Sequence, residues 1–444
     1  MLGSTPFSVA LADVLHDRLS VHPQDCARFQ VAGRTPRLVV SPRSVEEAAE
    51  AAAGIAAENA SLIVRGAGTK SSRPPSLRQL DAVLDMSQCS GVLEHAPGDL
   101  TVTLLAGTPW SQLQAALGKH GQFFPCDIAF EARATVGGVL AANSNGALRQ
   151  RYQSLRDNVL QMRVALSDGL VAKSGAKVVK SVAGYDAHKL FVGSWGTLGV
   201  IGEVTLKVAP LPVAERLLIA AFGAAAPAGD AAVKIARSNL FVAATTLHDL
   251  QSLRRVAALR TWSGAAAWNL VVRCSGSRAG VDRQIDAVFS GVTAAGATAT
   301  TPIEASGVSR AWSDIAELAG GAHYAADEFV VAKFACLPTQ TAALADAVRA
   351  VWPGAELTAH PAVGVVFAHV RAAADSVSAS TLAPLWRSVK ENAWTASFLA
   401  APTDLSDGLA APVPETSPIK IMRRLKAALD PAGAFDPGRF LAGI

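Results

Sequence analysis

The amino-acid sequence predicts an α+β protein with at least two domains. The chain has 444 residues, whereas one domain usually holds about 100 to 200. Segments typical of strands alternate with helix-like segments along most of the chain. A dense glycine pattern stops where Pro210 and Pro212 follow a strand, and we place a domain boundary there. We therefore expect an N-terminal helical segment over residues 1–33, domains over 34–212 and 213–415, and a C-terminal segment over 416–444.

The first domain is expected to begin in the order strand, helix, strand. RLVVSP (37–42) is typical of a strand, and Ser44 suits the start of a helix that runs to about Asn59. A second helix is expected in TPWSQLQAALGKHG (108–121), with its start at Thr108 or Pro109. The other expected strands are SLIVRG (61–66), DAVLDMS (81–87), LTVTLLAG (100–107), QMRVALSDG (161–169) and GVIGEVTLKVAP (199–210).

The second domain is expected to combine a sheet with a layer of helices. Its expected strands are ERLLIAAFG, FVAATTLHD, AAAWNLVVRCSG, EFVVAKFACLP and AVGVVFAHVRA, and its expected helices are GDAAVKIARS, GVDRQIDAVFSGV and TAALADAVRAVW. The segment ELTAHPAVGVVFAHVRA is interpreted as one long strand and its end, which would place His360 and His369 on opposite faces. These histidines are not spaced for a metal site, and either ordinary strand positions or a substrate role fits them.

The composition excludes several classes of protein. The 40 basic and 36 acidic residues give a net charge of +4 and are interspersed, so we expect no nucleic-acid partner. The five cysteines form no CxxC pair, which argues against a self-contained iron–sulfur or zinc site and against a disulfide framework. The N-terminus lacks the basic region of a signal peptide, and no run approaches the roughly 18 apolar residues of a membrane span. We expect a cytoplasmic protein that could reach a membrane only through a partner.

The stretch VRGAGTK (64–70) places a glycine loop directly after an apolar run. It lacks the third glycine of a dinucleotide-binding GxGxxG fingerprint, and its spacing does not fit a Walker A loop. Successive backbone amides around Gly66 to Thr69 could instead converge on an anion, with charge from Arg65 and Lys70 nearby. An ordinary glycine turn between strands is the alternative.

Two further segments share this glycine-rich character. Paired Gly137 and Gly138 precede the small polar run Asn143 to Gly146, and glycines recur every three residues from Gly193 to Gly202. A helix start and a close strand crossing would explain each segment by itself. Three such segments within about 140 residues favour a large phosphate-bearing cofactor.

The region from about Thr35 to Pro212 resembles the FAD-binding domain of FAD-linked oxidases of the p-cresol methylhydroxylase and vanillyl-alcohol oxidase type. The resemblance rests on four segments in the same order: VRGAGTK, ATVGGVLAANSNG, RYQSLRDNV and GSWGTLGVIGEVTLKV. VVKSVAGYDAHKL and IMRRLKAALDPAGAFDPGRF are most similar to the FAD-binding E subunits of bacterial glycolate oxidases. The resemblance implies a two-subdomain FAD-binding domain, a ferredoxin-like α+β substrate or cap domain, and a C-terminal segment that returns to the FAD domain.

The resemblance also implies which residues hold FAD. The residues expected to wrap the pyrophosphate are Arg65, Gly66, Ala67, Gly68 and Thr69. Those expected along the pyrophosphate and flavin are Thr135, Gly137, Gly138, Ala142, Asn143 and Gly146. Those in the next cofactor-side stretch and near the adenine half are Tyr152, Ser154, Arg156, Asp157, Gly196, Thr197, Leu198, Gly199 and Ile201. The phosphate loop contains no histidine, so noncovalent FAD is expected.

The catalytic residues stay unassigned by sequence. The chain has no paired-histidine segment like HxxGDGNxH, with which hydroxy-acid-oxidising flavoproteins hold a metal and take a proton, and no metal is expected. Tyr185 and His188 in AGYDAHKL are the polar candidates near a flavin, with a loop-stabilising role as the alternative.

The resemblance implies an FAD-dependent oxidoreductase that is a subunit of a glycolate oxidase-like 2-hydroxy-acid dehydrogenase. Its expected partners are a second flavoprotein subunit and an iron–sulfur subunit. Two alternatives stay open: a non-catalytic FAD-binding or scaffolding subunit that supports a catalytic partner, and a stand-alone FAD-linked alcohol oxidase. An NAD-dependent Rossmann enzyme is disfavoured because GxGxxG is absent.

Overall fold

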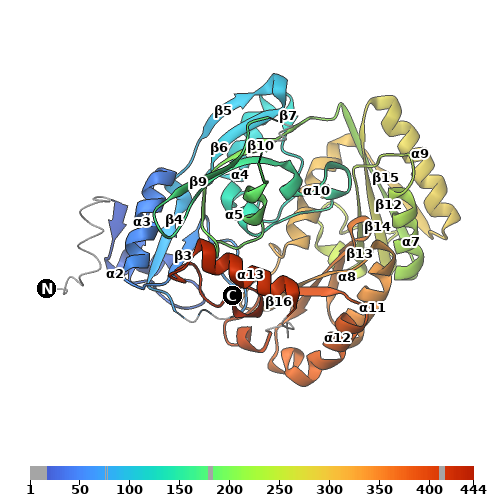
Figure 1. The fold of residues 1–444 in the computed structure, drawn as a ribbon. Coiled ribbons are helices and arrows are strands. Elements are labelled where there is room, and N and C mark those ends of the chain that lie inside the picture. The colour runs from blue at the N-terminus through green and yellow to red at the C-terminus, as the bar shows by residue number, and fades with distance from the viewer. Residues whose placement is uncertain (1–17, 76, 78, 179–183, 410–415) are drawn as a thin grey trace.

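The computed structural model describes residues 18–75, 77, 79–178, 184–409 and 416–444 (Figure 1). Residues 1–17, the first half of the expected N-terminal helical segment, lie outside this part. The described remainder contains a short strand, β1 (Leu19–Ser20), and one helical turn, α2 (Pro23–Cys26). It is therefore not helical throughout, because β1 pairs with the first expected strand.

The first sheet has four strands in the order β1-β2-β4-β3. Its three long members run parallel and are β2 (Leu38–Val40), β3 (Leu62–Arg65) and β4 (Ala82–Asp85). Helix α3 (Val45–Ala57) connects β2 to β3 and begins where the Ser44 Oγ accepts a hydrogen bond from the Glu47 N–H at 3.1 Å. The expected strand, helix, strand order is confirmed here, and a buried row of small α3 side chains packs on the sheet.

The second sheet has five antiparallel strands in the order β5-β6-β10-β8-β9. They are β5 (Val92–Ala96), β6 (Thr101–Leu105), β8 (Val159–Ala165), β9 (Val171–Gly175) and β10 (Val200–Lys207). The other elements of this region are α4 (Trp110–Gly118), β7 (Gln122–Phe123), α5 (Val136–Ala141), α6 (Arg149–Tyr152) and β11 (Ala209–Pro210). The sequence analysis missed β5 and β9 because both are edge strands with mostly exposed or half-buried side chains.

The third sheet has eight strands in the order β15-β12-β14-β13-β17-β18-β16-β19, all antiparallel. They are β12 (Ala214–Phe222), β13 (Ala244–Asp249), β14 (Trp268–Gly276), β15 (Ala299–Ile303), β16 (Phe329–Ala335), β17 (Glu356–His360), β18 (Val365–Arg371) and β19 (Thr395–Ala400). The helices of this region are α7 (Ala225–Ala236), α8 (Leu250–Arg255), α9 (Arg278–Ala294), α10 (Ala305–Ala319), α11 (Thr341–Val351) and α12 (Ala379–Glu391). The α+β class predicted from sequence is confirmed.

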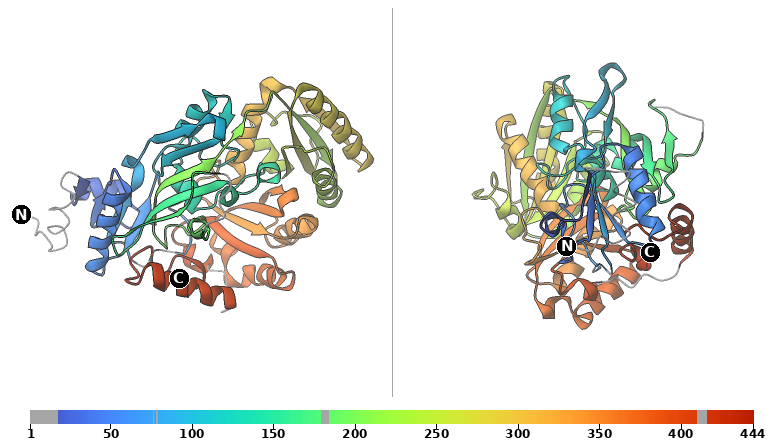
Figure 2. Two further views of the ribbon diagram at one scale, coloured as in Figure 1. Left: turned by 45° about the horizontal axis from the view of Figure 1, so that its top comes forward. Right: turned by 90° about the vertical axis from the view of Figure 1, so that its left-hand side faces the viewer.

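The two faces of the third sheet have different neighbours, because side chains alternate along a strand. On β12, Leu218 and Ala220 pack in the core under α7, α9, α11 and α12, whereas Leu217 and Ile219 pack against α8 and α10. Figures 1 and 2 show α10 between the large sheet, drawn in yellow to orange, and the blue and green first part of the chain. The α10 face is therefore the face turned toward the first two sheets.

The two histidines singled out from sequence lie on this inner face together, and the expectation of opposite faces is wrong. His360 ends β17, and a turn at Pro361–Val363 reverses the chain into β18, which contains His369. On the other face of the sheet, under α7, α9, α11 and α12, lies what we call the outer core. It contains the strand neighbours of the two histidines, Leu357, Ala359, Val366 and Ala368. The segment is a hairpin and not one strand. The alternation of side chains between the two faces, which holds along a single strand, therefore does not continue through the turn.

The C-terminal segment packs against the first sheet. Its helix α13 (Ser417–Leu429) is followed by Phe435, which is fully buried in the α3 core. The Leu62 N–H donates to the Ala434 carbonyl at 2.7 Å, and the Leu62 carbonyl accepts from the Asp436 N–H at 2.8 Å. The buried Asp430 carboxylate accepts hydrogen bonds from the backbone N–H groups of Ala434 and Phe435 and pairs with Lys426 Nζ at 2.6 Å.

Asp430→Asn is expected to destabilise the protein by about 2 to 3 kcal/mol, since a buried charged acceptor with three donors is lost. The exposed Asp404→Asn is the matched control and is expected to change stability by less than about 0.5 kcal/mol. Urea unfolding followed by circular dichroism measures both. Equal unfolding midpoints for the two variants would show that Asp430 does not stabilise the C-terminal segment as described.

Candidate functional site

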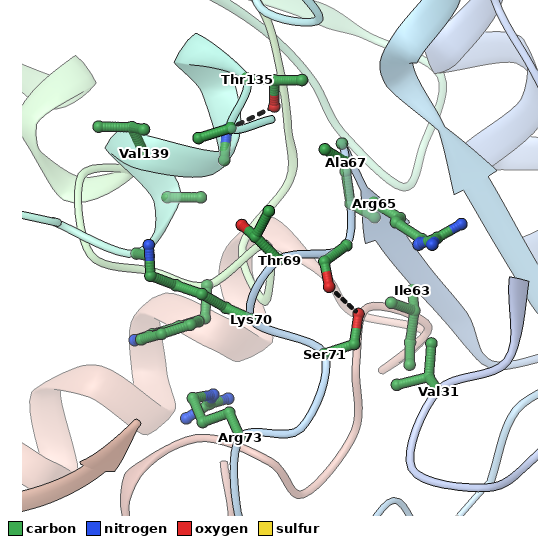
Figure 3. Close-up of a pocket in the computed structure, with 18 of the residues that line it drawn as sticks. Val31, Ile63, Arg65, Ala67, Thr69, Lys70, Ser71, Arg73, Thr135 and Val139 are labelled. Carbon is green, nitrogen blue, oxygen red and sulfur yellow. Dashed lines mark hydrogen bonds between the residues drawn. The ribbon is translucent and has the colours of Figure 1, made fainter. Parts of the chain in front are cut away.

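The glycine loop that follows β3 forms one wall of a cavity (Figure 3). The loop residues that line it include Arg65, Gly66, Ala67, Gly68 and Thr69, all singled out from sequence. The opposite wall comes from the start of α5 and from the C-terminal segment, through Thr135, Gly138, Val139, Asp436 and Arg439. The cavity therefore lies where the first sheet, the second sheet and the tail meet.

The cavity is strongly cationic. Arg65, Lys70, Arg73 and Arg439 line it together with a single carboxylate, that of Asp436. Burial and the neighbouring Arg439 lower the pKa of Arg73 to about 10. The two arginines are fixed by backbone carbonyls, because Arg73 Nη2 donates to the Arg439 carbonyl at 2.6 Å and Arg439 Nη2 donates to the Arg73 carbonyl at 2.7 Å. Such a cavity suits a polyanionic group.

Three polar atoms of this wall are buried and have no hydrogen-bond partner in the described part of the chain: Arg65 Nε, Asp436 Oδ1 and Arg439 Nε. Buried polar atoms are nearly always paired in folded proteins. Three such atoms around one cavity indicate that a bound molecule with acceptors and donors would complete their hydrogen bonding.

The glycines of the loop allow a close approach that other residues would prevent. A Cβ on Gly66 would lie 2.1 Å from Thr135 Oγ1, so the loop packs directly on the N-cap of α5. Gly68 has a φ of +69°, which L-residues rarely adopt. Among the described residues, no turn or cap hydrogen bond uses the amides of Ala67, Gly68 or Thr69. They remain available to an anion.

The start of α5 offers fewer unbonded backbone N–H groups than the sequence suggested. The Gly137 N–H donates to the Ala106 carbonyl at 2.7 Å, and the Gly138 N–H donates to Thr135 Oγ1 at 3.3 Å. Both glycines instead leave space, since they line a second small cavity. The other sequence-predicted residues that line this second cavity are Gly66, Thr135, Gly196, Gly199 and Ile201.

Several predicted cofactor residues lie away from these cavities. Ser154 and Asp157 form a local capping box, and Tyr152 packs edge-on against Phe123 with ring centroids 5.6 Å apart. Arg156, Thr197 and Leu198 line a separate groove beside α13, which Asn143 also reaches. Their expected contact with FAD stays a prediction.

The two catalytic candidates from sequence do not face a cavity that the structure outlines. Tyr185 is 96% exposed. His188 is buried, with Nδ1 3.2 Å from Ser174 Oγ and Nε2 3.2 Å from the Val159 carbonyl oxygen. Burial lowers the pKa of His188. These contacts favour the loop-stabilising alternative for His188.

A third cavity lies between the loops of the first part and the inner face of the third sheet, and we call it the junction cavity. Ala142, Asn143 and Gly146, predicted to follow the flavin, line one side of it. Lys333 of β16, His360 of β17 and Phe367 of β18 line the other side, and Lys70 reaches it from the glycine loop. Sequence analysis missed Lys333, although a lone lysine inside the apolar strand EFVVAKFACLP was a usable signal.

Helix α10 forms part of the wall of the junction cavity and contacts the loop at residues 127–131. The Glu317 carboxylate accepts the Phe130 N–H at 2.6 Å and the Glu131 N–H at 2.8 Å. Asp127 accepts from the Trp312 indole at 3.2 Å, and burial raises the pKa of this carboxyl group. The described residues contain no group of three or more histidine, cysteine, aspartate or glutamate side chains that could hold a metal ion.

Comparison with known proteins identifies the first part of the chain. Residues 36–175 match the family described as FAD binding domain. We call this part of the chain the FAD-binding domain, after the family that it matches. The loop, the start of α5 and the small cavity between them belong to this domain or adjoin it. The cationic wall and the unpaired Nε donors of Arg65 and Arg439 fit the pyrophosphate that FAD carries.

The chain also has relatives that are named as glycolate oxidase subunits and D-lactate dehydrogenases. The chain is 37% identical over 161 residues to glycolate oxidase subunit GlcE of Escherichia coli, which is 35% of this chain and 45% of that protein. It is 31% identical over 241 residues to the mitochondrial cytochrome-type D-lactate dehydrogenase of Arabidopsis thaliana, which is 54% of this chain and 42% of that protein. The chain thus spans less than half the length of these two relatives.

Solved structures confirm the fold over nearly the whole chain. 4-Ethylphenol oxidase from Gulosibacter chungangensis superposes with a TM-score of 0.74 at 14% identity, covering 98% of both chains. p-Cresol methylhydroxylase superposes with a TM-score of 0.73 at 15% identity, covering 97% of this chain and 95% of the other. At such identities the likeness concerns the fold alone, and it confirms the fold type predicted from sequence.

Gly66→Ala is expected to weaken FAD binding by at least about tenfold, because the new methyl group would force the loop away from Thr135. FAD content after reconstitution and dialysis measures the effect by absorbance. Gly98→Ala, where a Cβ would meet no atom within 4 Å, is the control and should keep its FAD. Full FAD content in a folded Gly66→Ala variant would show that the loop does not lie against the cofactor.

Proposed function

We propose that this protein is an FAD-dependent oxidoreductase and the FAD-binding subunit of a glycolate oxidase-like 2-hydroxy-acid dehydrogenase. The observation that carries the proposal is the cationic cavity at the glycine loop, with its unpaired buried polar atoms, inside a region that matches an FAD-binding domain. Relatives named glycolate oxidase subunits and D-lactate dehydrogenases supply the substrate class.

The loop amides of Ala67 to Thr69 would hold the FAD pyrophosphate, with Arg65 and Arg439 neutralising its charge. The glycines of α5 and of the 196–199 turn would leave room for the rest of the cofactor. Among the described residues, those lining the first and second cavities include no histidine, cysteine or tyrosine that could form a link to the flavin. His360 lines the junction cavity beside the residues predicted to follow the flavin, so our proposal of noncovalent FAD rests on the phosphate loop, which contains no histidine.

Bound FAD supplies a hydride acceptor for the oxidation of an alcohol carbon. The chain must then hold the substrate against the flavin, exclude water and accept the hydroxyl proton. The junction cavity adjoins the residues predicted to follow the flavin and is walled by apolar side chains of Ile128, Ile315 and Leu399. It is the best-suited place for a small substrate beside the cofactor.

We also propose a second flavoprotein subunit and an iron–sulfur subunit as partners. The chain is similar to proteins named GlcD as well as to one named GlcE, which supports an assembly of related flavoprotein chains. We place this assembly in the cytoplasm, with any membrane attachment through partners. No helix of the described residues is long and apolar enough to cross a membrane.

A non-catalytic FAD-binding subunit is the second candidate. The absence from the sequence of a paired-histidine segment like that of hydroxy-acid-oxidising flavoproteins favours it. The junction cavity, with two lysines and a histidine beside the predicted flavin site, favours catalysis instead.

The purified chain is expected to show a flavin absorbance spectrum and to release FAD on acid treatment. Anaerobic glycolate or D-lactate should bleach that spectrum if the chain is itself a dehydrogenase. FAD that stays oxidised until a partner subunit is added would support the non-catalytic candidate. A chain that takes up no flavin after reconstitution would refute the proposed function, and flavin that stays with the protein in acid would refute noncovalent attachment.

A further inference from the structure

The junction cavity brings together two lysines from distant parts of the chain. Lys70 follows the glycine loop, and Lys333 lies in β16, on the inner face of the third sheet. The neighbours of Lys333 along the strand, Ala332 and Phe334, point into the outer core. Alternation therefore directs the Lys333 side chain toward the FAD-binding domain.

Neither ammonium group has an ion-pair or hydrogen-bond partner among the described residues that would account for its position. The Lys70 ammonium is 5.9 Å from the centre of the Phe130 ring, and the two lysines repel each other, which contributes to a Lys70 pKa of about 8 that is caused mainly by burial. The acids that border the cavity are already engaged: Glu317 accepts two backbone N–H groups, and Asp127 accepts from Ala147, Leu148 and Trp312. Among the described residues, neither acid therefore forms an ion pair with Lys70 or Lys333, although the negative charge of Glu317 opposes the lowering of the Lys70 pKa.

The position of Lys70 separates this cavity from the predicted phosphate site. In Figure 3, Lys70 and Arg65 extend to opposite sides of the glycine loop. Lys70 lines both cavities, whereas Lys333 lines only the junction cavity. An anion held between the two lysines would thus be a molecule other than the FAD pyrophosphate and would lie next to the cofactor.

The remaining walls limit what that anion can be. Phe367, Ile315 and Leu399 are apolar, and His360 contributes an imidazole that burial keeps neutral, with a pKa lowered to about 3. No hydrogen bond joins the His360 ring to another described residue, so a ring nitrogen remains available to a ligand hydroxyl group. A short organic acid with one polar substituent matches this set of walls.

We propose that Lys70 and Lys333 form a binding site for the carboxylate of a small organic acid in the junction cavity. The role of this site rests on the proposed function. The two lysines would hold the substrate carboxylate, and His360 would lie near the substituent on the next carbon. Because the two lysines belong to different domains, the bound acid bridges the FAD-binding domain and the third sheet.

The test uses the full chain reconstituted with FAD and titrates it with oxalate by isothermal calorimetry at pH 7 and constant ionic strength. The wild type is expected to bind oxalate, and Lys333→Met and Lys70→Met are each expected to weaken it by about tenfold or more. Lys333→Arg should retain most of the affinity because it keeps the charge. The exposed Lys234→Met is the matched control and should bind like the wild type.

A rise from pH 7 to pH 9 should also weaken oxalate binding, since Lys70, with its pKa near 8, loses its proton. The titratable groups that face the pair are Cys126 and Glu317 beside Lys70, Arg149 and His360 beside Lys333, and Asp127 in the cavity wall. In Lys70→Met the oxalate affinity should change less between pH 7 and pH 9 than in the wild type. Loss of a lysine with a structural role alone would not reduce this pH dependence.

Unchanged oxalate affinity in Lys333→Met, or no oxalate binding by the wild type, would overturn the proposal. Tighter binding of inorganic phosphate than of oxalate would overturn the assignment to a carboxylate. FAD content is read from the absorbance of the same samples. A chain that holds FAD without binding oxalate refutes this site alone, whereas a chain without FAD refutes the proposed function.

Discussion

The arrangement of the site depends on how α10 docks against the loop at residues 127–131. One carboxylate, that of Glu317, accepts two consecutive backbone N–H groups, from Phe130 and Glu131. Charge-assisted hydrogen bonds of this kind are stronger than neutral ones, and two from one group also fix its orientation. A Cβ on Gly320 would lie 2.2 Å from Ala129 Cβ, so the end of α10 tolerates no larger residue there. This contact sets the distance between the third sheet and the FAD-binding domain.

The same contact explains why cationic groups remain without partners in the interior. The nearby acids, Glu317 and Asp127, accept backbone and indole N–H groups, and among the described residues neither forms an ion pair with Lys70 or Lys333. Lys70 and Lys333 therefore face each other across a partly buried space at an electrostatic cost. At the first cavity, Arg73 and Arg439 are likewise held side by side. An anion that binds only the folded protein would relieve this repulsion and stabilise the fold by mass action.

Sequence reasoning predicted the local structure well and the junction poorly, for physical reasons. The glycine loop could be predicted from the sequence because its geometry requires glycine at positions 66 and 68. Gly66 leaves no space for a Cβ beside Thr135, and Gly68 has a positive φ. Helix α10 was missed although Val308, Ala311, Trp312, Ile315 and Leu318 form a regular apolar face. Its start lacks a side-chain cap and includes Ser306 and Gly307, which lower helix propensity.

The junction cavity could not be predicted because its walls come from strands distant in sequence. Lys333 and His360 share a face only through the order β17-β18-β16, which depends on the hairpin at residues 361–363. The expectation of a single strand placed His360 and His369 on opposite faces. It therefore did not show that Lys333 and His360 share a face. In the structure the two histidines have separate environments, since His369 stacks on Tyr324 with ring centroids 4.1 Å apart, whereas His360 faces the cavity.

This separation bears on the choice between a catalytic and a non-catalytic subunit. A missing paired-histidine segment removes one known way to hold a metal and accept a proton, but the proposed oxidation of a hydroxy acid would require only a proton acceptor within reach of the hydroxyl group. His360 is neutral because it is buried and lies near cations. A carboxylate bound between Lys70 and Lys333 would offset those charges and raise the proton affinity of the imidazole.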